Sequence, residues 1–263
     1  MTENGVVLGA REIFKSFGHV EALRGASFEV RRGEVVALVG DNGAGKSTLI
    51  KILSGTLHPD AGEIHFEGRP VTIGSPTVAR GMGLETVYQD LALAPELDPA
   101  ANLFLGRELV RPFPLGLFGF LDKPAMRRSA AEAFSKLGVR IPSVTAPVAN
   151  LSGGQLQGVA VGRAVNWASK VLFMDEPTAA LGVVQAQHVL ELVRSVRDSG
   201  ISVVFISHNL PQVFEVADRI EVLRLGRRVA RFRASEATMV AVVAAMTGSV
   251  EQVDGTENGQ GSR

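Results

Sequence analysis

The chain has 263 residues, of which 46% are hydrophobic, enough for a sizeable core in one large domain or two lobes. Its 27 Lys and Arg balance 27 Asp and Glu, so the formal net charge of zero argues against a protein held to nucleic acid by bulk electrostatics. There are no cysteines, which excludes disulfides and thiolate chemistry. The apolar runs are far shorter than the roughly 20 residues that span a bilayer, and the first residues lack a signal-peptide pattern, so we expect a soluble protein.

Short apolar runs predict the core of the fold. The runs VVALV (35–39), VLFM (171–174) and VVFI (203–206) read as buried strands of a mostly parallel sheet. Between the last two runs, apolar residues recur at helical spacing up to Gly200, so this part predicts a strand–helix–strand unit. The segments FEVRRGEV and GEIHFEGRPV alternate and turn, which predicts a small antiparallel sheet beside the core.

Residues 90–165 differ from the rest of the chain. The segment KPAMRRSAAEAFSKLG predicts an amphipathic helix with Asp122 as its N-cap and Gly138 at its end. We therefore expect a helical lobe inserted between strands of the core. The tail, 249–263, is polar and rich in glycine, which predicts disorder.

The segment GDNGAGKS fits the phosphate-binding loop G-x-x-x-x-G-K-[ST], with a predicted strand before it and a helix after it. Glycines let backbone N–H groups wrap the phosphates, Lys46 offers a charge to the β and γ phosphates, and the Ser47 hydroxyl is a ligand for Mg²⁺. A glycine-rich turn with a chance lysine is the alternative, and the strand–loop–helix context disfavours it. The predicted nucleotide-binding residues of this loop are Gly40, Asp41, Asn42, Gly43, Ala44, Gly45, Lys46, Ser47 and Thr48.

Two acids follow the second apolar run. Asp175 at the strand end would hold Mg²⁺ directly or through water, and Glu176 would polarise the water that attacks the γ-phosphate. The alternative is that both acids only cap the turn before Pro177. His208 follows the third run. A lone histidine usually has a structural role, but its place at a strand end beside two phosphate motifs favours a contact with the γ-phosphate. Because ligands of parallel sheets bind outside the carboxyl ends of the strands, we expect these groups and Lys46 to meet in one crevice. The predicted catalytic residues are Glu176, His208 and Lys46.

A second glycine turn, LSGGQ, leads into a helix predicted at about 155–168. The Ser152 hydroxyl, the amides of Gly153 and Gly154 and the positive end of the helix dipole would together form an anion site. A plain N-cap needs the serine but not paired glycines, which let another backbone come close. One nucleotide has one γ-phosphate, so this spare site makes most sense if it binds a phosphate held by a second copy of the chain.

Together these motifs resemble the ATP-binding subunit of ATP-binding-cassette (ABC) transporters, over residues 5–248, and LSGGQ after a phosphate loop is highly specific to that family. The resemblance implies a homodimer that sandwiches ATP head to tail and uses ATP and Mg²⁺. It also implies integral membrane permease subunits as partners, a substrate-binding protein as an indirect partner, no nucleic acid, and a peripheral position on the cytoplasmic face of the cell membrane.

The same resemblance assigns further site residues. Gln89 in ETVYQD matches the loop glutamine that senses Mg²⁺ and the membrane subunit, which places it with Ser47 and Asp175 at the metal. His208 matches the switch histidine. Phe17 matches the position where an aromatic ring stacks on adenine; without the family it would be read as a strand residue of the core. The residues assigned to the partner's ATP are Ser152, Gly153, Gly154 and Gln155.

Three positions depart from the family pattern. Gly182 stands where the family usually has an aspartate that links the two sites, and Leu156 and Gly158 replace more polar or bulkier residues. Gly158 inside a helix costs about 1 kcal/mol relative to Ala, which predicts a less rigid signature helix. The segments ETVYQDLAL, ANLFLGREL and DEPTAALGV resemble most the importers of pentoses and related monosaccharides.

The implied fold is α/β: a P-loop NTPase core with a mostly parallel sheet, a small N-terminal antiparallel β-subdomain and an inserted α-helical subdomain. We expect a single ATP-binding domain at 1–248, with the core at 1–89 and 166–248 and the helical subdomain at 90–165. Its expected function is ATP hydrolysis that drives monosaccharide import.

Two other functions share some of these motifs. A soluble ATP-switched clamp on DNA or ribosomes usually adds a long coiled coil, zinc cysteines or a second cassette, and a small-molecule kinase leaves LSGGQ unexplained. The apolar segment FPLGLFGF leaves two alternatives open, packing within the helical lobe or docking on the membrane partner.

Overall fold

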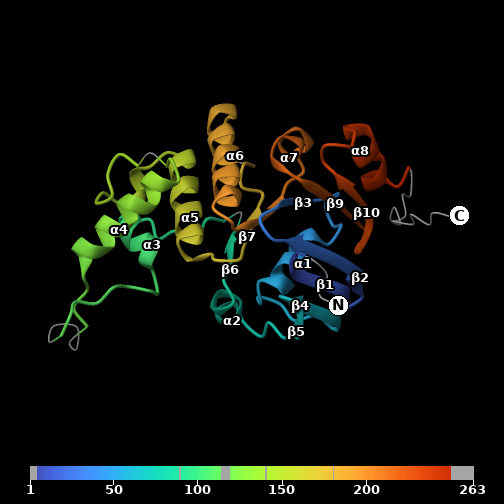
Figure 1. Ribbon diagram of the computed structural model, residues 1–263, viewed down its shortest axis with the longest axis horizontal. Coiled ribbons are helices and arrows are strands. Elements are labelled where there is room, and N and C mark those ends of the chain that lie inside the picture. Colours follow the sequence, from blue (N-terminus) through green and yellow to red (C-terminus); the bar gives the residue numbers. More distant parts are fainter. Residues whose placement is uncertain (1–4, 89, 114–118, 140, 180, 250–263) are drawn as a thin grey trace, which may run out of the picture.

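The computed structural model describes residues 5–88, 90–113, 119–139, 141–179 and 181–249. Two sheets form the core and a helical lobe projects from one end of it (Figure 1), so the predicted α/β fold is confirmed. Of the tail predicted to be disordered, only Ser249 lies inside the described residues. Within the described ranges, none of the helices is both long and apolar enough to span a membrane.

The larger sheet has six strands in the order β10-β9-β3-β8-β7-β6, and only the β10–β9 pair is antiparallel. Its strands are β3 (Val35–Val39), β6 (Leu84–Val87), β7 (Val171–Asp175), β8 (Ser202–Ile206), β9 (Arg219–Arg224) and β10 (Arg227–Arg233). The three apolar runs are β3, β7 and β8, as predicted, and they are neighbours in the sheet. The polar segments that follow them therefore leave the sheet at the same edge.

The smaller sheet is antiparallel, in the order β2-β1-β4-β5. Its strands are β1 (Val6–Phe17), β2 (Val20–Arg31), β4 (Ala61–Phe66) and β5 (Arg69–Val71). The segment GEIHFEGRPV forms the β4–β5 hairpin, as predicted. FEVRRGEV instead passes from β2 of this sheet to β3 of the other, so it joins the two sheets rather than turning within one.

Both faces of the parallel sheet are covered, which explains its continuous apolar strands. Val35, Ala37 and Val39 pack with residues of the helices on one face, whereas Val36 and Leu38 pack with α1 and the antiparallel sheet. This alternation follows from the two-residue period of a strand. The helices around the core are α1 (Lys46–Leu53), α2 (Pro76–Gly81), α6 (Val183–Asp198), α7 (Leu210–Val216) and α8 (Met239–Thr247).

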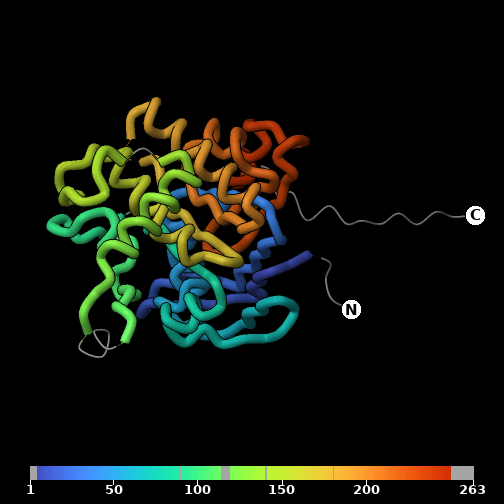
Figure 2. The backbone as a smooth tube through the Cα atoms, turned by 60° about the vertical axis from the view of Figure 1, so that its left-hand side comes forward, coloured from blue at the N-terminus to red at the C-terminus, as the bar shows by residue number. Residues whose placement is uncertain are grey.

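The helical lobe has a core of its own and lies to one side of the sheets (Figure 2). Its elements are α3 (Pro99–Phe104), α4 (Lys123–Lys136), the 3₁₀ helix η2 (Val148–Asn150) and α5 (Gly153–Trp167). Asp122 caps α4 by accepting a hydrogen bond from the Ala125 amide at 3.0 Å, as predicted. The signature helix α5 starts two residues earlier than the predicted Gln155 because Ser152 is its N-cap.

Glycines inside α5 have a packing role. A Cβ at Gly158 would lie 2.6 Å from Cγ1 of Val139, and one at Gly162 would lie 2.7 Å from Cε1 of Phe134. Such distances are too short for a methyl group, so these glycines let α5 lie close against α4 and the segment that follows it. Helix propensity, the basis of the prediction that Gly158 loosens the helix, does not take this packing into account.

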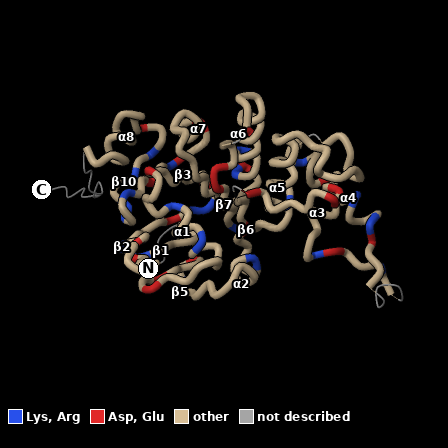
Figure 3. The backbone as a smooth tube through the Cα atoms, turned by 180° about the vertical axis from the view of Figure 1, so that it is seen from behind, with Lys and Arg blue, Asp and Glu red and all other residues tan. Residues whose placement is uncertain are grey.

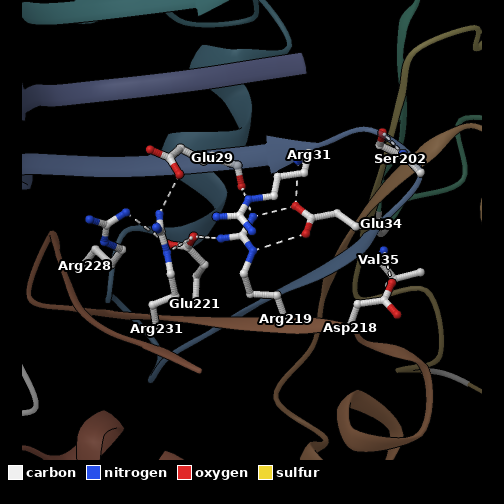
Figure 4. Close-up of polar contacts among 11 residues, drawn as sticks. Glu29, Arg31, Glu34, Val35, Ser202, Asp218, Arg219, Glu221, Arg228 and Arg231 are labelled. Carbon is white, nitrogen blue, oxygen red and sulfur yellow. Dashed lines mark hydrogen bonds and ion pairs between the residues drawn. The ribbon is translucent and has the colours of Figure 1, made fainter. Parts of the chain in front are cut away.

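An ion cluster joins the two sheets (Figure 4). Arg219 on β9 donates to Oε1 of Glu34 at 2.5 Å and to the backbone oxygen of Glu29 on β2 at 2.7 Å. Glu221, fully buried, is paired with Arg219 and with Arg231. Burial raises the pKa of the Glu221 carboxyl, and the surrounding arginines oppose that rise. Because each buried charge has a partner, the cluster can hold β2 against the core at acceptable cost.

Candidate active site

A cavity of about 480 Å³ lies at the carboxyl ends of β3, β7 and β8. Residues 42–48 of the phosphate loop, Asp175, Glu176 and His208 line it, together with 20–22 at the start of β2. The structure thus brings the predicted catalytic groups into one crevice. Elsewhere, basic and acidic residues are interspersed over core and lobe (Figure 3), so the balanced charge of the sequence is also balanced in space.

The phosphate loop packs so tightly that two of its positions require glycine. Gly40 has φ 154°, and a Cβ there would lie 2.2 Å from the Leu223 oxygen. Gly45 has φ 102°, and its Cβ would lie 2.7 Å from the Ala22 oxygen. Gly45 precedes α1 and offers no side-chain cap, which leaves the first amides of that helix for an anion.

Opposite charges meet in the cavity. The Lys46 ammonium donates to the backbone oxygens of Gly40 at 2.7 Å and Asp41 at 3.1 Å. Burial lowers the pKa of Lys46, and Glu176, Asp175 and Asp41 oppose that shift. Burial and the nearby Glu176 carboxylate raise the pKa of Asp175, and Lys46 opposes that rise. The two acids therefore repel one another in a partly desolvated site, where a cation would be stabilised.

The donor set near the acids fits Mg²⁺. Ser47 and Asp175 both line the cavity and offer the oxygen ligands that this ion prefers. Among the described residues there is no group of three or more His, Cys, Asp or Glu that could hold a metal. Magnesium commonly uses one or two carboxylates together with substrate phosphates. The single carboxylate of Asp175 and the hydroxyl of Ser47 are therefore enough protein ligands. Gln89, the third predicted ligand, lies outside the described residues.

Glu176 is held in an unusual position at the end of β7. Its φ is 51°, a costly value for a residue with a side chain, and its amide donates to the Ile206 oxygen at 3.0 Å. Nδ1 of His208 lies 2.8 Å from Oε1 of Glu176. The sequence prediction gave His208 to the γ-phosphate and missed this contact. No local pattern could reveal it, because the two residues are 32 positions apart and meet only through the sheet.

The signature residues lie elsewhere. Ser152 Oγ accepts from the Gln155 amide at 3.4 Å, and Gln155 Oε1 accepts from the Ser152 amide at 2.9 Å, which closes a capping box. Capping alone explains the serine and the glutamine, but it gives no reason for the exposed Gly153. A Cβ at Gly154 would lie 2.8 Å from Cγ of Gln185 on α6. None of the four signature residues lines the cavity of their own chain.

Phe17 is the last residue of β1 and 48% of it is exposed, so the reading of it as a core residue is wrong. Its ring lies 5.7 Å from the Lys15 ammonium. Val20, its pairing partner across the β1–β2 turn, lines the cavity, whereas Phe17 does not. Stacking of Phe17 on adenine stays a prediction.

The apolar segment FPLGLFGF is described only in part, since 114–118 lie outside the described residues. Phe113 is 85% exposed and Phe120 is 57% exposed. The Arg111 amide donates to the Phe120 oxygen at 2.8 Å, so the two arms of this excursion are joined through their backbones. The described aromatic rings of the segment therefore do not pack into the lobe.

A glycine-tight phosphate loop between a strand and a helix, with two acids after a neighbouring strand, defines a nucleoside-triphosphate-binding protein of the P-loop class. A family model described as ABC transporter matches residues 23–179. The chain therefore belongs to the ATP-binding proteins of ABC transporters, which hydrolyse ATP.

Individual relatives and solved structures agree with this family. The chain is 51% identical to the fructose import ATP-binding protein FrcA of Rhizobium meliloti, over 93% of this chain and 95% of the relative. It is 48% identical to the xylose/arabinose import ATP-binding protein XylG of Sulfolobus acidocaldarius, over 92% and 94% of the two chains. A solved ATP-binding cassette of an ABC transporter in its ADP conformation matches with a TM-score of 0.75 and 29% identity, covering 90% of this chain and 98% of that one.

Proposed function

We propose that this chain is the energy-coupling ATPase of a monosaccharide importer, in which ATP binding closes a head-to-tail dimer and hydrolysis reopens it. The observation that carries the proposal is a charged nucleotide cavity paired with an exposed LSGGQ signature that does not line it. FrcA and XylG are named for the import of fructose and of xylose and arabinose, which supports monosaccharides as the transported class. Their names also favour an importer over a clamp on DNA or ribosomes.

In the proposed reaction the phosphate loop binds ATP, one acid holds the metal ion and the other acts on water. Lys46 and the amides at the start of α1 bind the β and γ phosphates. Ser47 and Asp175 would hold Mg²⁺, which when bound neutralises charge on the phosphates. Glu176 accepts a proton from the attacking water while His208 keeps its carboxylate oriented. Attack on the γ-phosphorus breaks its bond to the bridging oxygen and yields ADP and phosphate.

The second half of each site would come from the partner. Ser152 Oγ and the amides of Gly153 and Gly154 stand at the positive end of a 15-residue helix, where an anion is stabilised. They would bind the γ-phosphate of the nucleotide held by the other copy, with Gln155 beside them. ADP has no γ-phosphate for this contact, so hydrolysis removes the bond that closes the dimer.

The helical lobe would carry the contact with the integral permease. Phe113 and Phe120 offer exposed apolar rings there. Gln89 would sense both Mg²⁺ and the permease. The subunit would thus sit peripherally on the cytoplasmic face of the membrane and reach the substrate-binding protein only through the permease.

Purification of the membrane complex through a tag on this chain tests the proposal. We expect an integral permease and a sugar-binding protein to copurify, and the reconstituted complex to hydrolyse ATP faster when the binding protein carries a monosaccharide. Lys46→Ala is the matched control, because it should assemble equally well and show no stimulation. Copurification with ribosomes or DNA in place of a permease would contradict the proposed function in import.

A further inference from the structure

The loop 91–98 connects β6 of the core to α3 of the lobe, and Arg163 on α5 holds its first part. Nη2 of Arg163 donates to the Leu91 oxygen at 2.9 Å, and Nη1 donates to the Ala92 oxygen at 2.8 Å. Ala92 has φ 47°, a value that is unfavourable for a residue with a Cβ and persists only where its surroundings fix it. The planar guanidinium suits this task because it offers two parallel donors in a fixed geometry.

A second set of bonds holds the far part of the loop. The Val148 amide donates to the Leu97 oxygen at 2.9 Å, and the Ala149 amide donates to the Pro95 oxygen at 3.1 Å. Both donors belong to η2, which ends at Asn150, two residues before the signature serine. The approach to the signature is therefore bonded directly to the loop.

The middle of the loop is held by Asn102 on α3, a fully buried side chain. Its Oδ1 accepts from the Ala94 amide at 2.8 Å, and its Nδ2 donates to the oxygens of Ala94 at 3.0 Å and Leu97 at 3.2 Å. A buried amide with every partner in place rigidifies its surroundings. The loop is thus held along its whole length and would shift as one piece.

These contacts tie the loop to the chain on both sides of the signature residues. Arg163 stands ten residues after Gly153 on a single helix, a separation of about 15 Å at 1.5 Å per residue. The bonds to η2 lie just before the other end of that helix. Burial lowers the pKa of the Arg163 guanidinium, and the Glu85 carboxylate on β6 opposes that shift.

We propose that Arg163 is a positioning residue that fastens the loop 91–98 to the signature helix, so that a shift of the loop sets the orientation of Ser152 and Gly153. The inference rests on the proposed function, because it needs the signature to bind the partner's ATP. It assigns to Arg163 no contact with nucleotide. Loss of the two guanidinium hydrogen bonds should therefore weaken closure of the dimer and leave binding of ATP to the single chain unchanged.

The test uses the full chain carrying Glu176→Gln, which should retain ATP in a closed dimer. We would add three substitutions to it, one at a time: Arg163→Gln, Arg163→Lys and, as matched control, Arg194→Gln. Arg194 is also a helix arginine that donates to a backbone oxygen, that of Glu215 at 3.1 Å. Two constants are measured: ATP affinity of the dilute monomer, by fluorescent nucleotide, and the ATP-dependent dimer dissociation constant, by light scattering.

Arg163→Gln should raise the dimer dissociation constant about tenfold or more, since it loses two charge-assisted bonds, with ATP affinity unchanged. Arg163→Lys keeps the charge but has a single donor nitrogen in place of the two parallel ones, so its dimer dissociation constant should fall between those of Arg163→Gln and the parent. Arg194→Gln should behave as the parent. Thermal unfolding checks that each variant is folded, and if Arg163→Gln does not fold, Arg163→Lys decides.

Unchanged dimerisation in a folded Arg163→Gln, or in Arg163→Lys where that variant decides, would overturn the inference. So would an equal loss in Arg194→Gln, which would mean general destabilisation, or a parallel loss of ATP affinity, which would place the effect in the nucleotide cavity. A failure of the parent itself to dimerise with ATP is a different result. It would overturn the proposed head-to-tail dimer before any variant of Arg163 is compared, and the inference would fall with it.

Discussion

The nucleotide cavity and the signature turn, which we both propose to bind phosphate, differ in charge and in burial. The cavity gathers Lys46, Asp175 and Glu176 in a partly desolvated space. The signature offers an exposed serine and glycine and no charged side chain from 150 to 155. The cavity can therefore bind and hydrolyse ATP. The signature can only add hydrogen-bond donors to a phosphate that a second copy of the chain holds. Each reads as half of a site.

The largest effect should come from the chemistry of the cavity. Glu176→Gln should slow hydrolysis by about 10²- to 10⁴-fold, because the attacking water loses its base. ATP binding should persist, since Lys46 and the loop glycines are intact, and a dimer should accumulate with ATP. Phosphate release and light scattering measure both effects. Steady hydrolysis at the parent rate would remove Glu176 from its role.

A smaller effect should follow from freeing the Glu176 carboxylate. His208→Gln removes the 2.8 Å contact to Oε1 and should lower the rate of hydrolysis by about tenfold, with little change in ATP affinity. The pairing is tested by combining His208→Gln with Glu176→Gln. If His208 acts through Glu176, the double variant should be no slower than Glu176→Gln alone; additive losses would mean an independent role, such as a contact with phosphate.

In the helical lobe, adding a single methyl group where α5 packs against Val139 should change the stability of the protein. Gly158→Ala should lower the free energy of unfolding by about 1–3 kcal/mol, because the new Cβ would lie 2.6 Å from Val139. Helix propensity alone predicts a gain of about 1 kcal/mol, so the two arguments differ in sign. Urea unfolding decides between them. Ala→Gly at the exposed helix position Ala131 checks the size of the propensity term in this chain.

The smallest effect on stability is expected at the exposed arm of the lobe. Phe113→Glu should change the free energy of unfolding by less than about 0.5 kcal/mol, because its ring is 85% exposed. Assembly with the permease should weaken if this arm docks there. Thermal unfolding and copurification separate the two readings: a folded variant that still assembles normally would contradict docking at Phe113.

Local pattern predicted much of this molecule. The apolar runs became β3, β7 and β8, and Asp122 caps α4, because strand and cap signals lie in neighbouring residues. The same is true of the phosphate loop, whose glycines are spaced along one short segment. These features need no knowledge of which distant segments meet.

What the sequence did not reveal depends on distant contacts. The Glu176–His208 pair is separated by 32 residues, and Arg163 reaches the Ala92 oxygen across 71. The value of Gly158 depends on Val139 of another segment. FEVRRGEV has the alternation of a hairpin, yet its two halves belong to different sheets. In each case the deciding partner is fixed by the tertiary fold and leaves no trace in nearby residues.

The most direct test asks whose phosphate the signature binds. Lys46→Ala disables the cavity, and Gly153→Asp puts a carboxylate where a phosphate must sit, so neither homodimer should occlude ATP. In a verified heterodimer of the two variants, a head-to-tail arrangement combines both lesions in one site and both intact motifs in the other. We predict that this heterodimer occludes about one ATP per dimer, as expected from phosphate binding at helix N-termini. If it occludes none, each chain uses its own signature, and the account of two half-sites is contradicted.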